Sequence, residues 1–417
     1  MIERARGTRD FVFEEMERRR NVENLLRNVC ERWGYREIAT PTFENSLLFK
    51  LKSGESIVEE MYVFKDKGGR EIALRPELTA PAFRLYVSEL QNRPKPLKIY
   101  YFGNCFRYEE PQSGRYREFW HFGVELLGTK EVEGEGEIIA LANELVNTVG
   151  IKNYKLRLGN ISILRKVIRK IGIKDEKKVL QLIDKGKKNE IKEIFKKENL
   201  EPEPLLTILD TKGDIDVLDR MERYGYVKEE VKRLKDIIHN IELQGMKNYT
   251  IDLGIARGLT YYTGMVFEID AEVLGAEKQI CGGGTYSLSE IFNIPQLPST
   301  GFAIGFDRLL ITLEREGMQL EEKGIDAYVI PVSRNEVENA IELVSFLRRN
   351  GVKADVDLMK RNLDKNLKHA NSIGAKNAIL VGENELKSGA VTVRNMTTGK
   401  QSSVRLLDLP AEMREGK

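Results

Sequence analysis

Hydrophobic positions near the start of the chain recur with the period of an α-helix. In residues 14–33 the apolar side chains share one helical face, at Val22, Leu25, Leu26, Val29, Cys30 and Trp33. Gly34 ends this pattern, and residues 35–43 have the composition of a strand that contains Pro41. Because proline lacks a backbone donor, we expect this strand at a sheet edge or an interface.

Further along, apolar and aromatic runs predict a sheet. Residues 97–102 and 119–127 read as two strands joined by a polar loop with Pro111, Ser113 and Gly114. Strand-like, glycine-rich sequence returns at residues 249–269, 279–286 and 301–305. These strands predict a mostly antiparallel body.

Two other regions differ from this body in composition and in the elements that they predict. Residues 156–244 are rich in lysine and read as helical, which predicts an insertion. After about residue 325, strands alternate with helices: strands at 327–332, 353–357, 377–381 and 390–394, helices at 335–349 and 362–373. This alternation predicts a compact α/β domain of ~90 residues with parallel pairing. The expected domains are therefore a discontinuous α+β body (1–155 and 245–322), a helical insertion (156–244) and an α/β domain (326–417).

Composition narrows the class of protein. The 417 residues are 41% hydrophobic and 32% charged, which is typical of a globular chain. Three cysteines and three histidines are too sparse for a CxxC or HExxH metal motif or a disulfide framework. The start has no apolar leader, and no apolar run approaches 18 residues. We expect a soluble, cytoplasmic protein with no structural metal and no membrane partner.

The net charge of +2 is the sum of segments whose own charges differ in sign. Residues 165–200 hold thirteen Lys and Arg against six Asp and Glu, and residues 351–405 hold ten against five. The remaining 326 residues carry a net charge of −10. Positive charge thus gathers in the predicted insertion and the last domain, a pattern that suits a polyanionic partner such as a nucleic acid. Solvated helices can show the same pattern.

The loop between the two central strands carries the densest chemistry. Residues 106–119 read FRYEEPQSGRYREF, with three arginines, an acidic pair and an aromatic at the end. Side chains alternate across a strand, so Arg107 and Glu109 share a face. Arginine suits bidentate contact with phosphate oxygens, and Phe119 could stack on a purine. A cross-strand salt-bridge surface is the alternative.

Three glycine-bearing segments accompany this loop. Residues 256–264 place Arg257, Tyr261 and Tyr262 between glycines. Residues 281–286 contain a Gly-Gly-Gly run, which lets backbone approach a ligand but more often marks a bulge. Residues 301–309 read as a strand, a glycine and a helix opening with Arg308, which alone could be a solvated charge.

Together these segments resemble the class II aminoacyl-tRNA synthetases, and within that class the histidyl-tRNA synthetase family. Residues 35–44 resemble motif 1, the dimer-interface strand; residues 106–119 resemble motif 2, and residues 301–309 motif 3. The segment RGLTYYTGMVFE at 257–268 is similar to one peculiar to histidyl enzymes. The resemblance runs from Arg6 to the last domain. It implies a class II synthetase-like α+β catalytic domain with an antiparallel sheet, followed by a C-terminal α/β anticodon-binding domain.

The resemblance implies roles toward ATP and the reacting carboxylate. The residues are Arg107 and Arg257 as the catalytic arginines at the α-phosphate, Arg308 near the γ-phosphate and adenine, Arg115 at the γ-phosphate, Phe119 stacked on adenine and Glu109 at its edge. Such a reaction concentrates negative charge on phosphate oxygens, so positioned cations and Mg²⁺ are the expected catalytic device.

The resemblance also implies a pocket for histidine. Glu125 matches the carboxylate that contacts one imidazole nitrogen, and Tyr262 the hydroxyl that contacts the other. Tyr261 and Tyr286 are expected to line this pocket. A site that pairs both nitrogens can reject apolar analogues by about 10⁴–10⁵.

The α-amino group of the amino acid is expected to bind Glu77 and Thr79 of the LRPELT segment, with His121 beside them. His121 stands where the family usually has glutamine, although a neutral imidazole can still accept a hydrogen bond. A packed core histidine is the alternative. Thr260 and Thr285 replace a common aspartate and a common arginine.

The expected partners are histidine, ATP and tRNA(His), with a homodimer formed through the motif 1 region. Arg361, Lys365 and Lys368 are candidates for contact with the anticodon. Two alternatives stay open: another class II synthetase (threonyl, prolyl or glycyl), and the synthetase-like histidine-sensing regulatory subunit of ATP phosphoribosyltransferase. The latter family lacks the anticodon domain.

Overall fold

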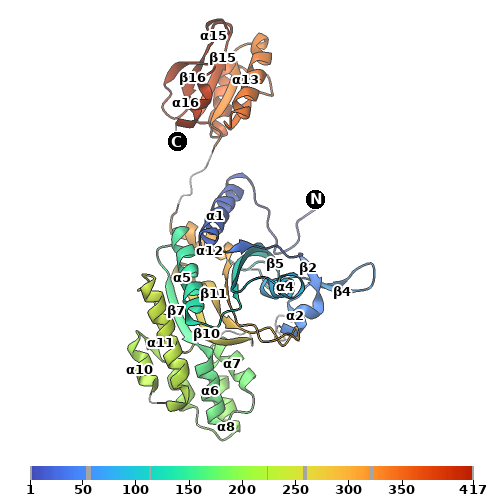
Figure 1. Ribbon diagram of the computed structural model, residues 1–417. Helices are drawn as coiled ribbons and strands as arrows, with labels where there is room; N and C mark the ends of the chain where they lie inside the picture. The colour runs from blue at the N-terminus through green and yellow to red at the C-terminus, as the bar shows by residue number, and fades with distance from the viewer. Residues whose placement is uncertain are drawn as a thin grey trace. The chain divides into compact units, whose positions relative to one another are not determined.

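The computed structural model describes residues 2–52, 58–111, 114–222, 224–256, 261–318 and 324–415. The chain divides into two compact units, Met1–Gln319 and Leu320–Lys417 (Figure 1). Among the described residues, no helix is both long enough and apolar enough to cross a membrane.

A nine-stranded sheet forms the centre of the first unit, in the order β1-β5-β6-β12-β11-β10-β7-β9-β8. Its strands are β1 (Arg36–Glu37), β5 (Leu97–Phe106), β6 (Glu118–Leu127), β7 (Lys155–Asn160), β8 (Lys212–Gly213), β9 (Thr250–Asp252), β10 (Tyr262–Asp270), β11 (Gln279–Tyr286) and β12 (Ser299–Gly305). Pairing is antiparallel from β5 through β7 and parallel at β1–β5 and β7–β9. The expected antiparallel body is confirmed.

Helices pack against this sheet, as Figure 1 shows. They are α1 (Phe13–Arg32), α5 (Val132–Thr148), α11 (Lys228–Leu243) and α12 (Phe306–Arg315), and the short helix η3 (Glu272–Glu277) contacts α12. The helix predicted at 14–33 is α1, and Val22, Leu26 and Cys30 on its apolar face are fully buried. The apolar period therefore located this helix to within one residue at each end.

The single strand predicted at residues 35–43 is wrong. Residues 36–37 form β1, which pairs with β5, whereas β2 begins at Phe43 in a separate three-stranded sheet ordered β2-β4-β3. Pro41 lies between the two strands, where it cannot donate a ladder hydrogen bond. The small sheet comprises β2 (Phe43–Asn45), β3 (Val63–Lys65) and β4 (Glu71–Leu74), next to α2 (Ser46–Lys52), α4 (Thr79–Leu85) and η1 (Tyr86–Leu90).

The lysine-rich region at residues 156–244 forms short helices, as its composition predicted. They are α6 (Ile161–Ile171), α7 (Glu176–Asp184), α8 (Lys188–Lys197), α9 (Glu203–Leu209), α10 (Asp216–Glu222) and η2 (Gly225–Val227). Their buried faces hold residues such as Ile163, Val167 and Phe195. Strand β7 leads into these helices but belongs to the large sheet, since it pairs with β10.

The second unit has a five-stranded sheet ordered β14-β13-β15-β16-β17. Its elements are β13 (Ala327–Pro331), η4 (Arg334–Glu336), α13 (Val337–Arg349), β14 (Ala354–Val356), α14 (Leu363–Ser372), β15 (Asn377–Val381), α15 (Glu383–Ser388), β16 (Ala390–Asn395), β17 (Gln401–Arg405) and α16 (Leu409–Glu415). The first three strands are parallel, as expected, and β16 and β17 add antiparallel pairs. No helix or strand is predicted between residues 381 and 390 or after residue 394, so α15, β17 and α16 are seen only in the structure.

Candidate active site

A cavity of about 660 Å³ opens on the large sheet of the first unit. Twelve of the thirteen predicted site residues line it: Glu77, Thr79, Arg107, Glu109, Arg115, Phe119, His121, Glu125, Tyr261, Tyr262, Tyr286 and Arg308. The thirteenth, Arg257, lies outside the described residues, as does Thr260. The fold thus gathers side chains from residue 77 to residue 308 around one space.

Strand β6 sets the long axis of this cavity. Phe119, His121 and Glu125 occupy alternate positions and therefore face the same side of the sheet. At ~3.4 Å per residue, Phe119 and Glu125 lie about 20 Å apart along the strand. We call the end near Phe119 the arginine end (Arg107, Arg115, Arg308) and the end near Glu125 the tyrosine end (Tyr101, Tyr262, Tyr286).

At the tyrosine end, Glu125 is 2% exposed and both of its carboxylate oxygens accept hydrogen bonds. The Tyr101 hydroxyl donates to Oε1 at 2.8 Å, and the Tyr286 hydroxyl donates to Oε2 at 2.7 Å. Gly301 is the cross-strand partner of Glu125, and any side chain there would collide with its carboxylate. A carboxylate has about four lone-pair sites, so Glu125 keeps capacity for a ligand donor.

Tyr101 is a site residue that the sequence analysis missed. It lies on β5 opposite Gly123, whose missing side chain leaves room for the tyrosine ring. Burial, with the nearby Glu125 charge, raises the pKa of Tyr101 well above its usual value, and the same causes act on Tyr286. Both hydroxyls therefore stay protonated as donors. The glycine opposite a tyrosine was the available signal, but strand pairing had to be known to use it.

The remaining tyrosines form a ring cluster beside Glu125. The rings of Tyr261 and Tyr262 are 4.8 Å apart, and Tyr261 meets Tyr286 edge-on at 5.8 Å. Tyr262 and Tyr286 are buried. The cluster gives the tyrosine end an apolar wall with polar hydroxyl groups, which suits a small polar ring.

Between the two ends lie Glu77, Thr79 and His121. The Glu77 carboxylate accepts hydrogen bonds from the Thr79 and Ala80 amides, 2.8 and 3.1 Å away, and so caps the start of α4. Thr79 Oγ1 lies 3.3 Å from the Tyr101 hydroxyl, which links this segment to the tyrosine end. A capping role explains why the LRPE segment turns here.

His121 is held as a neutral imidazole. Burial, with the positive charges of Arg107 and Arg308, lowers the pKa of His121 from 6.5 to about 3. Its Nδ1 lies 3.8 Å from the Cys105 sulfur, and its ring meets Phe119 edge-on. A neutral ring facing the cavity can accept a hydrogen bond from a cationic group of a ligand.

Backbone carbonyls hold two guanidinium groups at the arginine end. Arg107 donates from Nε to the Pro76 carbonyl at 3.0 Å, and its guanidinium lies 5.2 Å from the centre of the Phe119 ring. Arg308 donates to the carbonyls of Gly114 and Gln279 at 3.2 and 3.0 Å. These fixed cations form a site for a polyanion.

Glu109 joins the cations of this end. Its carboxylate lies 3.7 Å from Arg107 Nη1 and 3.4 Å from Arg115 Nη1. Glu109 therefore balances part of the positive charge and keeps both arginines oriented toward the cavity.

Asp307, the residue before Arg308, stabilises the arginine end. It is 3% exposed and accepts from Arg9 at 2.6 Å, from Arg19 at 2.8 Å and from the Trp120 amide at 2.8 Å. A carboxylate with several donors fixes the junction between β6 and α12. Trp120 and Asp307 directly follow Phe119 and directly precede Arg308 in the chain, so this contact helps to fix the backbone next to both side chains.

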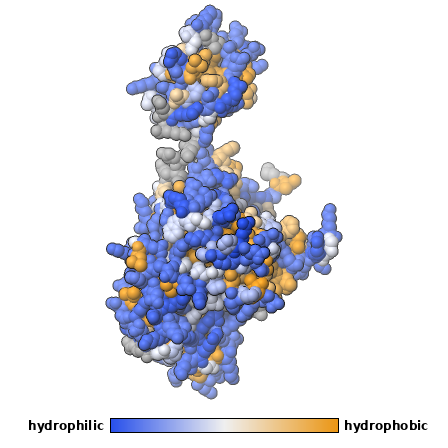
Figure 2. Space-filling view, viewed as in Figure 1, coloured by the Kyte–Doolittle hydropathy of each residue, from blue (hydrophilic) through white to orange (hydrophobic). Residues whose placement is uncertain are grey.

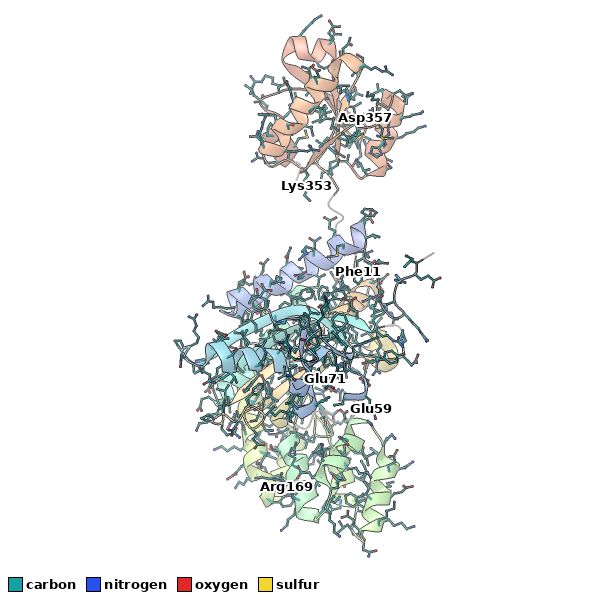
Figure 3. The ribbon with its side chains drawn as sticks, turned by 90° about the vertical axis from the view of Figure 1, so that its right-hand side faces the viewer. Phe11, Glu59, Glu71, Arg169, Lys353 and Asp357 are labelled. Atoms are coloured by element: carbon teal, nitrogen blue, oxygen red, sulfur yellow. The ribbon has the colours of Figure 1, made fainter. Side chains whose placement is uncertain are left out.

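The insertion also reaches the cavity, which the sequence analysis did not predict. Gln181, Asp184 and Lys185, at the end of α7, contribute to its lining. Glu59, labelled in Figure 3, lines it from the segment before β3. These residues are remote in sequence from every motif, so no local pattern pointed to them.

Thr285, a departure from the expected arginine, faces away from this cavity. Its neighbour Tyr286 points to Glu125, and alternation along β11 turns Thr285 to the opposite face. There Thr285 Oγ1 donates to Glu135, which also pairs with Arg233 at 2.6 Å. Arg233 of α11 therefore supplies a positive charge next to the Glu135 carboxylate that Thr285 contacts.

Comparisons with known proteins agree with this geometry. A family model described as Histidyl-tRNA synthetase matches residues 7–309, and one described as Anticodon binding domain matches residues 326–416. The chain is 47% identical to the histidine–tRNA ligase of Archaeoglobus fulgidus, covering 96% of both chains. It is 44% identical to that of Methanosarcina acetivorans, covering 98% of this chain and 97% of the relative. The crystal structure of apo S. aureus histidyl-tRNA synthetase superposes with a TM-score of 0.74 at 30% identity, over 99% of this chain and 100% of that one.

Proposed function

The chain belongs to the histidyl-tRNA synthetase family, and on this basis we propose that it is an ATP-dependent histidine–tRNA ligase. It activates histidine to histidyl-adenylate with release of pyrophosphate, then transfers histidine to the 3′ end of tRNA(His). One observation supports this most: a single cavity joins a buried, tyrosine-held carboxylate to a group of arginines near Phe119, at the other end of β6. Histidyl-adenylate has a polar ring at one end and a nucleotide at the other.

Histidine binds at the tyrosine end in this proposal. Glu125 accepts the N–H of one imidazole nitrogen, and the Tyr262 hydroxyl pairs the other nitrogen. Tyr261 and Tyr286 surround the ring. The supporting feature is that Glu125 is buried and already oriented by two donors, so little reorganisation is needed on binding. An amino acid without these nitrogens leaves Glu125 unpaired, which is the basis of rejection.

The α-amino group lies between the two ends, near Glu77, Thr79 and His121. A neutral His121 can accept from an ammonium group without repelling it. This placement brings the α-carboxylate toward Arg107 and the α-phosphate.

ATP binds at the arginine end. Phe119 stacks on adenine and Glu109 contacts its edge, while Arg115 and Arg308 hold the γ-phosphate. Arg107 and Arg257 stabilise the charge that develops as the carboxylate attacks the α-phosphate and pyrophosphate leaves. Carbonyl contacts to Arg107 and Arg308 hold these cations in place before ATP arrives, which supports a preorganised site.

Mg²⁺ is expected to accompany the ATP phosphates. Within the described ranges, however, no group of three or more His, Cys, Asp or Glu side chains could hold a metal ion. Glu77, Glu109 and Glu125 are each engaged by protein donors. The residues present do not form a protein cage for the ion, so we assign it no ligands.

The partner tRNA(His) meets the last domain, residues 326–417, in this proposal. The catalytic domain comprises 1–155 and 245–322, with 156–244 as the insertion. The match of the anticodon-binding model and the net positive charge of residues 351–405 support the last domain of this division, whereas β7 and β8 of the insertion pair within the large sheet. Deleting residues 326–417 is expected to spare adenylate formation and impair tRNA charging; equal loss of both activities would contradict the assignment.

We further propose a cytoplasmic homodimer that associates through the motif 1 region. Exposed apolar side chains lie on β2, at the end of this region, and on the neighbouring α2 and β3: Phe43, Leu47, Leu51, Val63 and Phe64 (Figure 2). A contiguous exposed apolar patch is typical of a protein–protein interface. Sedimentation of the double variant Leu47→Glu, Leu51→Glu tests this, with a monomer expected.

ATP–pyrophosphate exchange measured with each of the twenty amino acids tests the function. Exchange with histidine alone is expected. Exchange with threonine, proline or glycine would favour another class II synthetase, and exchange with none would favour the histidine-sensing regulatory subunit. The family match over residues 7–309 and the ligase relatives favour the histidine–tRNA ligase over both.

A further inference from the structure

The first residues of β10 extend beyond their neighbouring strand. The register of β10 with β7 starts at Met265, opposite Asn160, and the pairing with β11 slips between Tyr262 and Val266. Tyr262, Thr263 and Gly264 therefore form an overhang. Backbone carbonyls in such an overhang need other partners, because a buried carbonyl without one is costly.

Helix α6 of the insertion supplies these partners. The chain turns from β7 directly into α6 at Asn160, so the first turns of α6 lie against β10 (Figure 1). Ser162 donates from Oγ to the Thr263 carbonyl at 2.6 Å. Arg165 donates from Nη2 to the Tyr262 carbonyl at 3.3 Å. Side chains of the insertion thus replace the ladder where strand pairing ends.

Arg165 is itself oriented from the next helix. Its Nη1 donates to Glu176 of α7 at 2.5 Å, and the two side chains are 21% and 19% exposed. Burial by itself would raise the pKa of Glu176, but hydrogen bonds from Arg169 and Arg165 hold it below its usual value. The Glu176 carboxylate therefore stays ionised and keeps the Arg165 guanidinium in place.

The position of the Tyr262 backbone affects the pocket. The Tyr262 side chain lines the cavity, and its ring centre lies 4.8 Å from that of Tyr261. The Tyr261 ring in turn meets the Tyr286 ring edge-on. Tyr286 in turn donates to Glu125. A shift of the overhang would move the ring cluster relative to the Glu125 carboxylate.

We propose that Arg165, oriented by Glu176, is a positioning residue that sets the affinity for histidine through the backbone of Tyr262. This inference rests on the proposed function and assigns a specificity role to a part of the chain outside the three motifs. The insertion is then part of the amino acid pocket as well as a tRNA-facing module.

The chain offers a matched control in Arg169. Arg165 and Arg169 lie one turn apart on α6, and both pair with Glu176, but only the Arg165 guanidinium contacts the Tyr262 carbonyl. Arg169, labelled in Figure 3, is 68% exposed. In ATP–pyrophosphate exchange, Arg165→Met is expected to raise the KM for histidine about ten-fold and leave the KM for ATP within about two-fold. Arg169→Met is expected to change the KM for histidine much less, because Glu176 keeps its direct hydrogen bond to Arg165, and to leave the KM for ATP unchanged.

Two further variants separate positioning from general stability. Arg165→Lys keeps a cationic donor and is expected to recover most of the histidine affinity. In a Tyr262→Phe background, Arg165→Met is expected to add little, because its effect runs through Tyr262. If a thermal melt shows that Arg165→Met is not folded, Glu176→Gln tests the same series of contacts. Glu176→Gln is expected to raise the KM for histidine.

The outcomes are distinguishable. Equal KM changes in the Arg165 and Arg169 variants, or additive effects of Arg165→Met and Tyr262→Phe, would overturn the inference while the proposed function stands. Absence of histidine-dependent exchange in the unmodified chain would overturn the proposed function, and the inference with it.

Discussion

The two ends of the cavity are built in different ways. At the tyrosine end, side chains hold one another: Tyr101 and Tyr286 both donate to the buried carboxylate of Glu125. At the arginine end, main-chain carbonyls hold the guanidinium groups of Arg107 and Arg308, as at Gly114 and Gln279. One end is a network of side chains around a single carboxylate, and the other is a set of cations held by main-chain carbonyls, with Glu109 between Arg107 and Arg115.

This difference matches what each end has to recognise. A small polar ring is distinguished from other amino acids only if every buried polar group has one correct partner, so a fully satisfied network serves selectivity. A polyphosphate offers many equivalent oxygens, so several positioned cations suffice and each adds to transition-state stabilisation. Substitutions at the tyrosine end should therefore act on histidine, and those at the arginine end on the rate with any bound amino acid.

The largest effect is expected from Glu125→Gln. The amide presents a donor where two tyrosine hydroxyls and the imidazole all need an acceptor, so kcat/KM for histidine should fall by about 10³–10⁴. The KM for ATP should stay within about two-fold. Steady-state exchange kinetics measure both, and a parallel loss of ATP affinity would mean that the two ends do not act separately.

The next largest effect is expected at the other end, from Arg308→Ala. Loss of one preorganised cation should lower kcat for exchange by about 10²–10³, with the KM for histidine little changed. Arg315→Ala on the same helix is the control, because that exposed side chain donates to the Val273 carbonyl outside the cavity. If Arg308→Ala also raises the KM for histidine, the two ends of the cavity do not act separately.

A smaller change is expected from Tyr101→Phe. This variant removes one of the two donors to Glu125 and keeps the ring over Gly123, so the KM for histidine should rise about ten-fold. Tyr286→Phe should behave alike if the network is symmetric. Titration of histidine binding by calorimetry gives the affinities without the chemical step.

The smallest effect concerns His121, between the ends. Its pKa is lowered to about 3 in the folded chain, against 6.5 ordinarily, so the folded state favours the neutral ring. The resulting stability is complete above about pH 6.5 and is lost as pH falls toward 3. Between pH 7 and pH 5, the unmodified chain should lose about 1–2 kcal/mol more of its free energy of unfolding than His121→Gln does. Denaturant titrations at both pH values measure this; identical pH dependence would show that His121 is not held neutral.

Much of the fold followed from local patterns. The 3.6-residue period located α1, because a buried helical face imposes its period on the sequence, and apolar and aromatic runs located β5 and β6. The strand predicted at 35–43 failed since a short apolar run does not reveal which sheet each half joins. Pairing partners are chosen by contacts between residues distant in sequence.

The candidate site shows the same division. Motif residues such as Glu125 and Arg308 were identified from the sequence, and the fold brings them to one cavity. Tyr101 and the end of α7 were missed, because their roles depend on a glycine across a strand pair and on where an insertion folds back. Neither relation leaves a periodic signal.

The sequence by itself therefore determined the elements, the family resemblance and the chemical types of the site, since these depend on local composition and spacing. Only the tertiary structure decided which donors hold Glu125, how His121 stays neutral, and that Arg165 of the insertion reaches the Tyr262 carbonyl. Hydrogen bonds and charge effects act over a few ångströms in space, and folding alone brings residues 101 and 286 that close to residue 125, and residue 165 that close to residue 262.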